Sequence, residues 1–381
     1  KTSEYLYPAD DTEEGKLLRL RQEYFLSAAA VGELIDAYVA LHGTDFSSFP
    51  VYNTIQLNDT HPVLSVAEFV RILTSTYSVS FSKAVSIAKQ VFNYTNHTIL
   101  PEALDCWPQD YIRKLLPEIY TILKKFDAAE HREFRRNGVS QADEEAMSIL
   151  RNDTFSMANL AVYVAHRVNG VAKIHTGILK DSLFRPAYAF APEKFVNITN
   201  GITQRRWLQL CNEEFSALID RKIGCGWREN IGLLSELKKF GNEDSVIAEF
   251  AQIKEKKKEQ LADYVYRKEK IRLLPGGIVY AQVKRLHEYK RQLMTAFAIL
   301  EIYEKLKKGD LEDFRPAVFL FGAKSAPSYF RAKGIIKFIN EIAKKIAADD
   351  RVNKKLQVVF VTDYNVSYAE KIVAGSHVSL Q

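Results

Sequence analysis

The first part of the chain carries apolar residues at the spacing of an amphipathic helix. Between residues 13 and 42 they recur every three to four positions, with polar residues between them, which predicts one long helix. The short apolar run Val51–Leu57 predicts a strand, and the turn Asn58–Pro62 leads into a helix from about Leu64. Asp59 or Thr60 in that turn is of the type that caps a helix.

Helical patterns continue as far as residue 168. They cover Ser82–Phe92, Gln109–Phe126 and Glu144–Val168. The stretch Phe195–Trp207 differs, because asparagine and glycine residues lie between its apolar positions, which is typical of a loop. We therefore expect a domain boundary there, between one domain over residues 1–205 and a second over residues 206–381.

In the second half, short apolar runs rich in β-branched residues alternate with amphipathic helical patterns. This alternation predicts an α/β domain with a doubly wound parallel sheet. Ligands bind such sheets beyond the carboxyl ends of the strands, so the segments that follow the strands are candidate sites. The expected strands are Ile278–Val283, Ala317–Phe321, Leu356–Val361 and the start of another at Val378, and the helices between them are Gln292–Lys307, Tyr329–Ala347 and one that begins at Tyr368.

The composition is that of an ordinary globular protein, with 47% hydrophobic, 12% aromatic and 26% charged residues. The formal net charge of +6 comes from 53 basic and 47 acidic residues, and no basic stripe interleaved with aromatic residues indicates a nucleic-acid partner. No apolar run reaches the roughly 18 residues of a membrane span, so no membrane partner is expected. Cys106, Cys211 and Cys225 have neither disulfide-framework nor metal-ligand spacing, which predicts a cytoplasmic protein without a metal site.

The segment that follows the first strand of the second half is strongly cationic. Residues 283–291 read Val-Lys-Arg-Leu-His-Glu-Tyr-Lys-Arg and contain the cations Lys284, Arg285, Lys290 and Arg291. Arginine can chelate a phosphate through two nitrogens, and lysine adds a mobile charge. Charge pattern alone leaves two interpretations open, a phosphate site or the solvated start of a basic helix.

Six segments of the chain together resemble the α-glucan phosphorylases. They follow one another in the family's order, and the resemblance extends from about Tyr7 to Gln381. The segments are Gln56–Pro62, Tyr94–Leu104, Val168–His175, Thr199–Trp207, Lys284–Arg291 and Phe321–Pro327. The resemblance implies a two-domain α/β architecture of the GT-B type. Residues 1–205 then form part of the N-terminal glucan-cleft domain, and residues 206–381 form a truncated part of the Rossmann-like cofactor and phosphate domain.

The resemblance also implies roles for individual residues. Lys284 matches a lysine that contacts the phosphate of pyridoxal phosphate, and Arg285 and Lys290 match residues that hold the substrate phosphate. His97 and Asn200 match residues that hydrogen-bond glucose. The remaining matches are Val171 in an apolar wall of the glucose pocket, Tyr364, Trp207 and Gln381 near the cofactor, Asp10 and Asp11 in a loop that gates the cleft, and Asp59 and His61 in a cleft-lining turn.

Four of these residues have simpler interpretations when the family is set aside. His97 fits a loop histidine with satisfied hydrogen bonds, and Asn200, which precedes Gly201, fits a turn residue. Asp59 fits a helix cap, and Trp207 fits core packing.

The reaction implied by the resemblance is phosphorolysis of terminal α-1,4-glucosidic bonds, in which inorganic phosphate and an α-1,4-glucan yield glucose 1-phosphate. The cofactor is pyridoxal 5'-phosphate, and the parent protein is expected to be a homodimer. In the family pattern the Schiff-base lysine lies beyond Gln381, so residues 1–381 alone are expected to be inactive. The alternatives are a nucleotide-sugar glycosyltransferase of the same two-domain build and a non-catalytic glucan-binding fragment.

Overall fold

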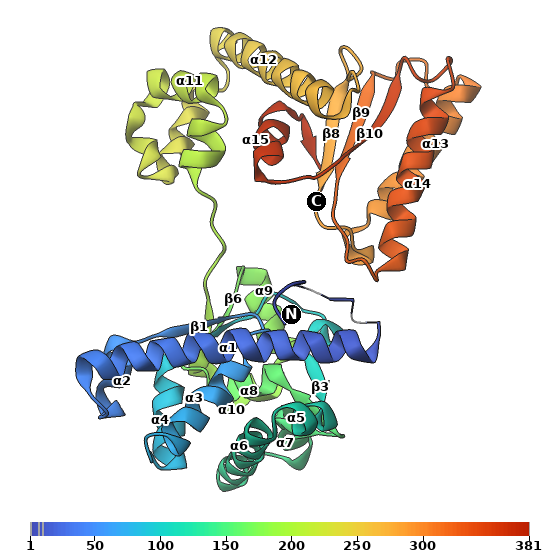
Figure 1. The fold of residues 1–381 in the computed structure, drawn as a ribbon. Coiled ribbons are helices and arrows are strands. Elements are labelled where there is room, and N and C mark those ends of the chain that lie inside the picture. The colour runs from blue at the N-terminus through green and yellow to red at the C-terminus, as the bar shows by residue number, and fades with distance from the viewer. Residues whose placement is uncertain (1, 7, 10, 381) are drawn as a thin grey trace. The chain divides into compact units, whose positions relative to one another are not determined.

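The computed structural model describes residues 2–6, 8–9 and 11–380 (Figure 1). The chain divides into two compact units, Lys1–Gly201 and Ile202–Gln381. The division falls slightly before the boundary after residue 205 that the sequence suggests. The Arg205–Leu210 segment forms one turn of π-helix that contacts helix α11 (Glu213–Ile223), so it belongs to the second unit.

The first unit is built on a four-stranded parallel sheet with the order β1-β2-β6-β7. The strands are short because each contributes only a few residues to the core before the chain turns toward solvent. Leu57 of β1 pairs with Tyr94 of β2, and Tyr94 pairs in turn with Val168 of β6; all three side chains are buried. The bounds are β1 Ile55–Asn58, β2 Phe92–Thr95, β6 Val168–Gly170 and β7 Phe195–Asn197.

Helix α1 (Glu13–His42) confirms the long helix expected from the sequence. Thr12 caps it by accepting a hydrogen bond from the Gly15 amide at 3.1 Å, which satisfies one of the free donors of the first turn. The buried side chains Val31 and Ile35 belong to the face that packs on α3 (Leu64–Ser75). By length and composition alone α1 also contains an 18-residue window apolar enough to cross a membrane, with a mean hydropathy of 1.4, a test that core helices of soluble proteins and signal sequences also pass; here 22% of the window is buried.

Further helices and a small antiparallel sheet complete the first unit. The sheet consists of β3 (Cys106–Pro108), β5 (Thr154–Ser156) and β4 (Leu150–Arg151), in that order. The remaining helices are α2 Phe49–Tyr52, α4 Phe81–Val91, α5 Gln109–Leu115, α6 Pro117–Arg136, α7 Gln141–Met147, α8 Met157–Val164, α9 Lys173–Ile178 and α10 Arg185–Phe190.

Several predicted boundaries in the first unit are wrong. The pattern over 109–126 forms two helices, because Pro117 has no N–H group and starts a new helix. The pattern over 144–168 is interrupted by the hairpin β4–β5, whose turn residues Asn152 and Asp153 have φ angles of 49° and 58°. The strand expected over 51–57 begins only at Ile55, after α2, and the expected loop over 195–207 contains β7.

The second unit contains a parallel sheet with the order β10-β9-β8-β11, as the alternating pattern predicts. Alternate residues of each strand face opposite sides. Val279, Val318 and Val359 pack with α12 and α15, whereas Phe319 and Val358 pack with α13 and α14, so helices cover both faces of the sheet (Figure 1). The elements are β8 Ile278–Val283, β9 Ala317–Gly322, β10 Leu356–Val361, β11 Val378–Ser379, α12 Asp244–Glu269, α13 Gln292–Lys308, α14 Phe330–Ala347 and α15 Val366–Gly375.

Candidate functional site

In the first unit, the residues directly after the four parallel strands lie along the same edge of the sheet. This follows from topology, because the carboxyl ends of parallel strands meet at one edge. The edge carries Asp59 after β1, His97 after β2, Val171 after β6 and Asn200 after β7. Four of the residues expected to bind the glucan are thus brought to one edge.

His97 is exposed at this edge. Its Nε2 lies 2.6 Å from Oδ1 of Asn58, an amide oxygen that accepts a hydrogen bond from the Nε2–H tautomer. The Nδ1 atom has no hydrogen-bond partner among the described residues, so it can accept a bond from a ligand hydroxyl. Asn200 is also exposed. Its backbone N–H donates to the Val171 carbonyl at 2.9 Å, which fixes the backbone position of Asn200.

His175 connects the loops that follow β2 and β6. Its Nδ1 accepts a 3.0 Å hydrogen bond from the Val171 amide, and its Nε2 lies 3.1 Å from Oδ1 of the buried Asn96. The Asn96 oxygen also accepts the Thr98 amide at 2.9 Å. The segments that carry His97 and Val171 are therefore held in a common network, and the sequence motif alone gave no role to His175.

Asp59 and His61 form a turn that differs from the expected helix cap. Asp59 adopts a φ of 72°, and its carboxylate accepts the Thr60 amide at 2.8 Å. Helix α3 begins at Leu64 without a side-chain cap, so the capping prediction for Asp59 and Thr60 is wrong.

Asp105, which the sequence did not single out, organises this turn. Its Oδ2 accepts hydrogen bonds from Thr60 Oγ1 at 2.6 Å and His61 Nδ1 at 2.8 Å. The bond to Asp105 raises the pKa of His61. Burial acts to raise the pKa of Asp105, but the bonds from His61 and Thr60 outweigh it and the pKa is lowered. The pair therefore favours a protonated His61 beside an ionised Asp105.

Glu23 of α1 lies beside this pair and is buried, with 7% exposure. One ligand atom each of Glu23, His61 and Asp105 lies within 4.8 Å of the others, a spacing that a metal ion could use. However, Arg19 Nε donates to Glu23 at 2.8 Å, and its Nη2 lies 3.1 Å from His61 Nδ1. The guanidinium thus already supplies positive charge there, and we assign no metal.

We expect Glu23 to make the protein less stable as the pH rises. Burial, and then the charge of Asp105, raise the pKa of Glu23 from 4.5 to about 7. The folded state therefore holds this proton more tightly than the unfolded chain, and the free energy of unfolding falls as the pH rises from the unfolded pKa to the folded one. In Glu23→Gln this fall should shrink by roughly 2–3 kcal/mol, as measured by urea denaturation between about pH 5 and about pH 8.

The matched control is Glu33→Gln, which changes an exposed glutamate of the same helix and should leave the pH dependence unaltered. An unchanged pH dependence in Glu23→Gln would show that Glu23 is not protonated in the folded state.

The gating loop expected at Asp10 and Asp11 is only partly described. Asp10 lies outside the described residues, and Asp11 is exposed just before the Thr12 cap of α1. No hydrogen bond among the described residues ties the Asp11 side chain to the glucan edge.

In the second unit, three cations cluster after β8. Lys284 and Arg285 directly follow β8, and Lys290 ends the 3₁₀ turn Glu288–Lys290. Burial lowers the pKa of Lys284, and the charge of Lys290 lowers it further. Burial also lowers the pKa of Lys290, and there the charge of Arg285 adds to the effect. None of the three forms an ion pair among the described residues, and such a cluster is suited to bind anions.

The carboxylate nearest in sequence to these cations is already occupied. Glu288 accepts hydrogen bonds from Tyr329 Oη at 2.8 Å and from Arg331 Nη1 at 2.9 Å. The Glu288 carboxylate thus binds residues of α14 and of the loop before it. It forms no ion pair with Lys284 or Lys290.

Two buried glutamines donate hydrogen bonds to backbone carbonyls of the cationic segment. Gln292 Nε2 donates to the Arg285 carbonyl at 3.1 Å, and Gln282 Nε2 donates to the Lys290 carbonyl at 3.4 Å. Both side chains are nearly inaccessible, and the Oε1 atom of each has no hydrogen-bond partner among the described residues. The sequence motif did not reveal these two supports.

The structure places one of the three residues expected near the cofactor at the carboxyl end of the β10-β9-β8-β11 sheet. Tyr364, in the loop after β10, packs against Gly322 at the end of β9, where an added Cβ would lie 3.1 Å from the Tyr364 ring. Gln381 lies outside the described residues. Trp207 is half-buried in the Arg205–Leu210 turn, and in the described part of the chain no hydrogen bond or ion pair joins its side chain to the β8–β10 edge.

Comparison with known proteins gives one consistent result. A family described as carbohydrate phosphorylase matches residues 1–381. The chain is 38% identical over 383 residues to glycogen phosphorylase from Chlamydia pneumoniae, covering all of this chain and 46% of that protein. It is 38% identical over 390 residues to the liver form of human glycogen phosphorylase (100% of this chain, 46% of that protein) and 39% identical over 380 residues to the Bacillus subtilis enzyme (100% and 48%). The chain thus spans about half the length of these relatives.

Proposed function

The chain belongs to the carbohydrate phosphorylase family, and we propose that the protein containing it cleaves terminal α-1,4-glucosidic bonds of glycogen or maltodextrin with inorganic phosphate. The glucosidic bond of the terminal glucose breaks, phosphate bonds to its C1 to give glucose 1-phosphate, and the proton of the phosphate passes to O4 of the shortened glucan, which is the leaving group. Relatives named glycogen phosphorylase match the chain over its whole length. This favours phosphorolysis over a nucleotide-sugar glycosyltransferase or a non-catalytic glucan-binding fragment.

The observation that carries this proposal is the group of cations after β8 that forms no ion pair with any residue that the structure describes. We assign Arg285 and Lys290 to the substrate phosphate and Lys284 to the phosphate of pyridoxal phosphate. Burial and then repulsion by a neighbouring cation lower the pKa values of Lys284 and Lys290, and a bound anion would offset this repulsion. This donor set therefore fits a site for two phosphate groups.

When bound, pyridoxal phosphate supplies a phosphate group that can exchange a proton with the substrate phosphate. The chain's own part is electrostatic. Arg285 chelates the substrate phosphate through its fork of N–H groups, and Lys290 adds a point charge. A phosphate held beside the breaking bond stabilises the positive charge that develops on the sugar. Tyr364 and Trp207 are proposed to border the cofactor.

The sugar is assigned to the edge of the first unit. His97 and Asn200 hydrogen-bond the terminal glucose, and Val171 supplies an apolar wall. His97 Nδ1 can accept a hydrogen bond from a glucose hydroxyl when Nε2 donates to Asn58 Oδ1. Asp59 and His61 are proposed to line the path of the glucan.

We place the protein in the cytoplasm as a homodimer. Cys106, Cys211 and Cys225 are free thiols, in keeping with a reducing compartment, and one relative, from Arabidopsis thaliana, is named a cytosolic α-glucan phosphorylase. The 381 residues contain no Glu-Ala-Ser-Gly-Thr-x-Asn-Met-Lys segment. We therefore propose that residues 1–381 by themselves are inactive.

Asn200→Ala in the full-length protein should lower kcat by about 10- to 100-fold while changing KM for long maltodextrins less than threefold. Remote sugar units supply most of the glucan affinity, whereas a contact to the reacting sugar is strengthened in the transition state. Initial rates at varied maltodextrin and saturating phosphate separate the two constants. A variant with unchanged kcat and a raised KM would place Asn200 outside the reacting subsite.

A further inference from the structure

The first unit contains a cavity of about 580 Å³ that lies away from the candidate glucan edge. It is lined by Arg167, which directly precedes β6, by Lys194, which directly precedes β7, and by Lys89 of α4, which leads into β2. These positions lie at the amino ends of the parallel strands. His97, Val171 and Asn200 follow the carboxyl ends, so the cavity is separate from the site described above.

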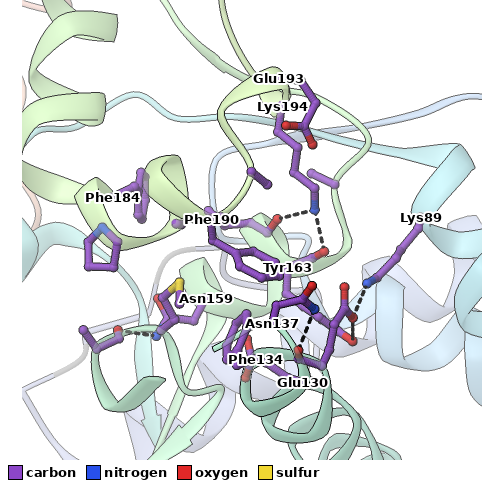
Figure 2. Close-up of a pocket in the computed structure, with 18 of the residues that line it drawn as sticks. Lys89, Glu130, Phe134, Asn137, Asn159, Tyr163, Phe184, Phe190, Glu193 and Lys194 are labelled. Carbon is purple, nitrogen blue, oxygen red and sulfur yellow. Dashed lines mark hydrogen bonds and ion pairs between the residues drawn. The ribbon is translucent and has the colours of Figure 1, made fainter. Parts of the chain in front are cut away.

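Part of the cavity wall is aromatic. Phe134 of α6 packs edge-to-face on Phe190 of α10, with ring centroids 5.0 Å apart, and on Tyr163 of α8 at 6.3 Å. Phe184 and Met147 add apolar surface, and Figure 2 shows the four aromatic side chains around a common space. A volume in the range of about 300–1,000 Å³ with mainly apolar walls suits a small organic ligand.

Two lysines reach this cavity, and their partners differ (Figure 2). Lys89 Nζ forms an ion pair with Glu133 at 2.9 Å, and Tyr163 Oη donates to the same carboxylate at 2.8 Å. Lys194 Nζ instead donates to the backbone carbonyls of Val162 at 3.2 Å and Tyr163 at 2.8 Å. No carboxylate of the described residues forms an ion pair with Lys194.

Lys194 thus carries a largely buried ammonium group whose charge is not balanced by an ion pair with any described residue. Two of its three N–H donors are used by neutral carbonyls, which leaves one donor for a ligand. Burial raises the pKa of the neighbouring Glu130 well above its ordinary value, which disfavours the charged form that could balance Lys194. Burial also lowers the pKa of Lys194 to about 8. An anionic group that reached Lys194 would remove this electrostatic cost.

We propose that this cavity binds a small aromatic carboxylate, with the ring against Phe134 and Tyr163 and the carboxylate on Lys194 Nζ. A monoanion fits better than a dianion, because Glu133 and Glu193 also line the cavity and would repel a second negative charge. A neutral aromatic compound would fill the same space but leave the third donor of Lys194 unused.

The test is isothermal titration of the full-length protein with 2-naphthoate and with 2-naphthalenemethanol, which has the same ring system and no charge. We expect 2-naphthoate to bind at least tenfold more tightly. Lys194→Met, which keeps the side-chain length and removes the charge, should abolish this preference and retain phosphorolysis. The control Lys173→Met, an exposed lysine on α9, should keep the preference. Equal binding of both probes, or a preference that survives Lys194→Met, would overturn the proposal.

A second measurement does not depend on any variant folding. Crystals of the unsubstituted full-length protein grown with 2-naphthoate should show the ring against Phe134 and Tyr163 and the carboxylate within hydrogen-bond distance of Lys194 Nζ. A cavity without ligand in crystals that carry 2-naphthoate elsewhere, or with maltodextrin bound in its place, would reject the proposed ligand class.

Discussion

Replacing Arg285 by alanine in the full-length protein should lower kcat/KM for inorganic phosphate by roughly 30- to 1,000-fold, equivalent to about 2–4 kcal/mol of transition-state stabilisation. The guanidinium follows β8 directly and has no ion pair among the described residues, so its charge is available to an anion. Arg285 is exposed in this structure, but arginine binds phosphate through two parallel charge-assisted N–H groups, and losing both contacts in the transition state is costly. Initial rates at varied phosphate and saturating maltodextrin measure the effect.

The control for Arg285 is Arg351→Ala. Arg351 is an exposed arginine of the same unit that precedes β10 and pairs with Asp349, at the opposite end of the sheet. It should retain wild-type rates, whereas Lys290→Ala should follow Arg285→Ala in direction. Wild-type use of phosphate by Arg285→Ala would remove this residue from the phosphate site.

Gly170→Ala should destabilise the first unit by about 1–3 kcal/mol, the usual cost of overpacking. Gly170 ends β6, and a Cβ added there would lie 2.9 Å from the Cα of Thr176 in α9. Because the obstacle is backbone, a rotamer change cannot relieve the clash. The shift would also disturb Val171 and the His175 bond to its amide. Thermal or urea denaturation of the variant measures the loss of stability.

The matched control is Gly177→Ala in the neighbouring helix α9, where an added Cβ meets nothing within 4 Å. That variant should be as stable as the parent or more stable, because alanine favours the helix. Equal stability of the two alanine variants would show that β6 and α9 are less closely packed than described.

The two units differ in how much of their fold the sequence predicts. In the second unit, six-residue strands such as Ile278–Val283 are long enough to give a clear β-branched run, and their parallel order follows from the intervening helices. In the first unit, strands of three or four residues such as Val168–Gly170 are too short to interrupt a helical pattern. The Asn152-Asp153 turn signal within the predicted helix 144–168 could have revealed the hairpin there.

The site is predictable only where its residues directly follow strands or belong to a family motif. Arg285 meets both conditions, whereas His97 was predicted from the family motif alone, because the sequence analysis did not predict β2. Asp105 binds a turn more than 40 positions earlier, and Asn96 meets His175 nearly 80 positions later. Such long-range contacts leave no local periodicity or turn chemistry, so Asp105 and His175 emerged only from the structure.

The central claim is tested most directly by ³¹P NMR of the full-length protein with pyridoxal phosphate, maltodextrin and inorganic phosphate. We predict that the phosphate resonance decreases while a glucose 1-phosphate resonance grows, and that Arg285→Ala greatly slows both changes. An unchanged phosphate resonance while the maltodextrin is consumed, or glucan elongation that requires a nucleotide sugar, would contradict the account.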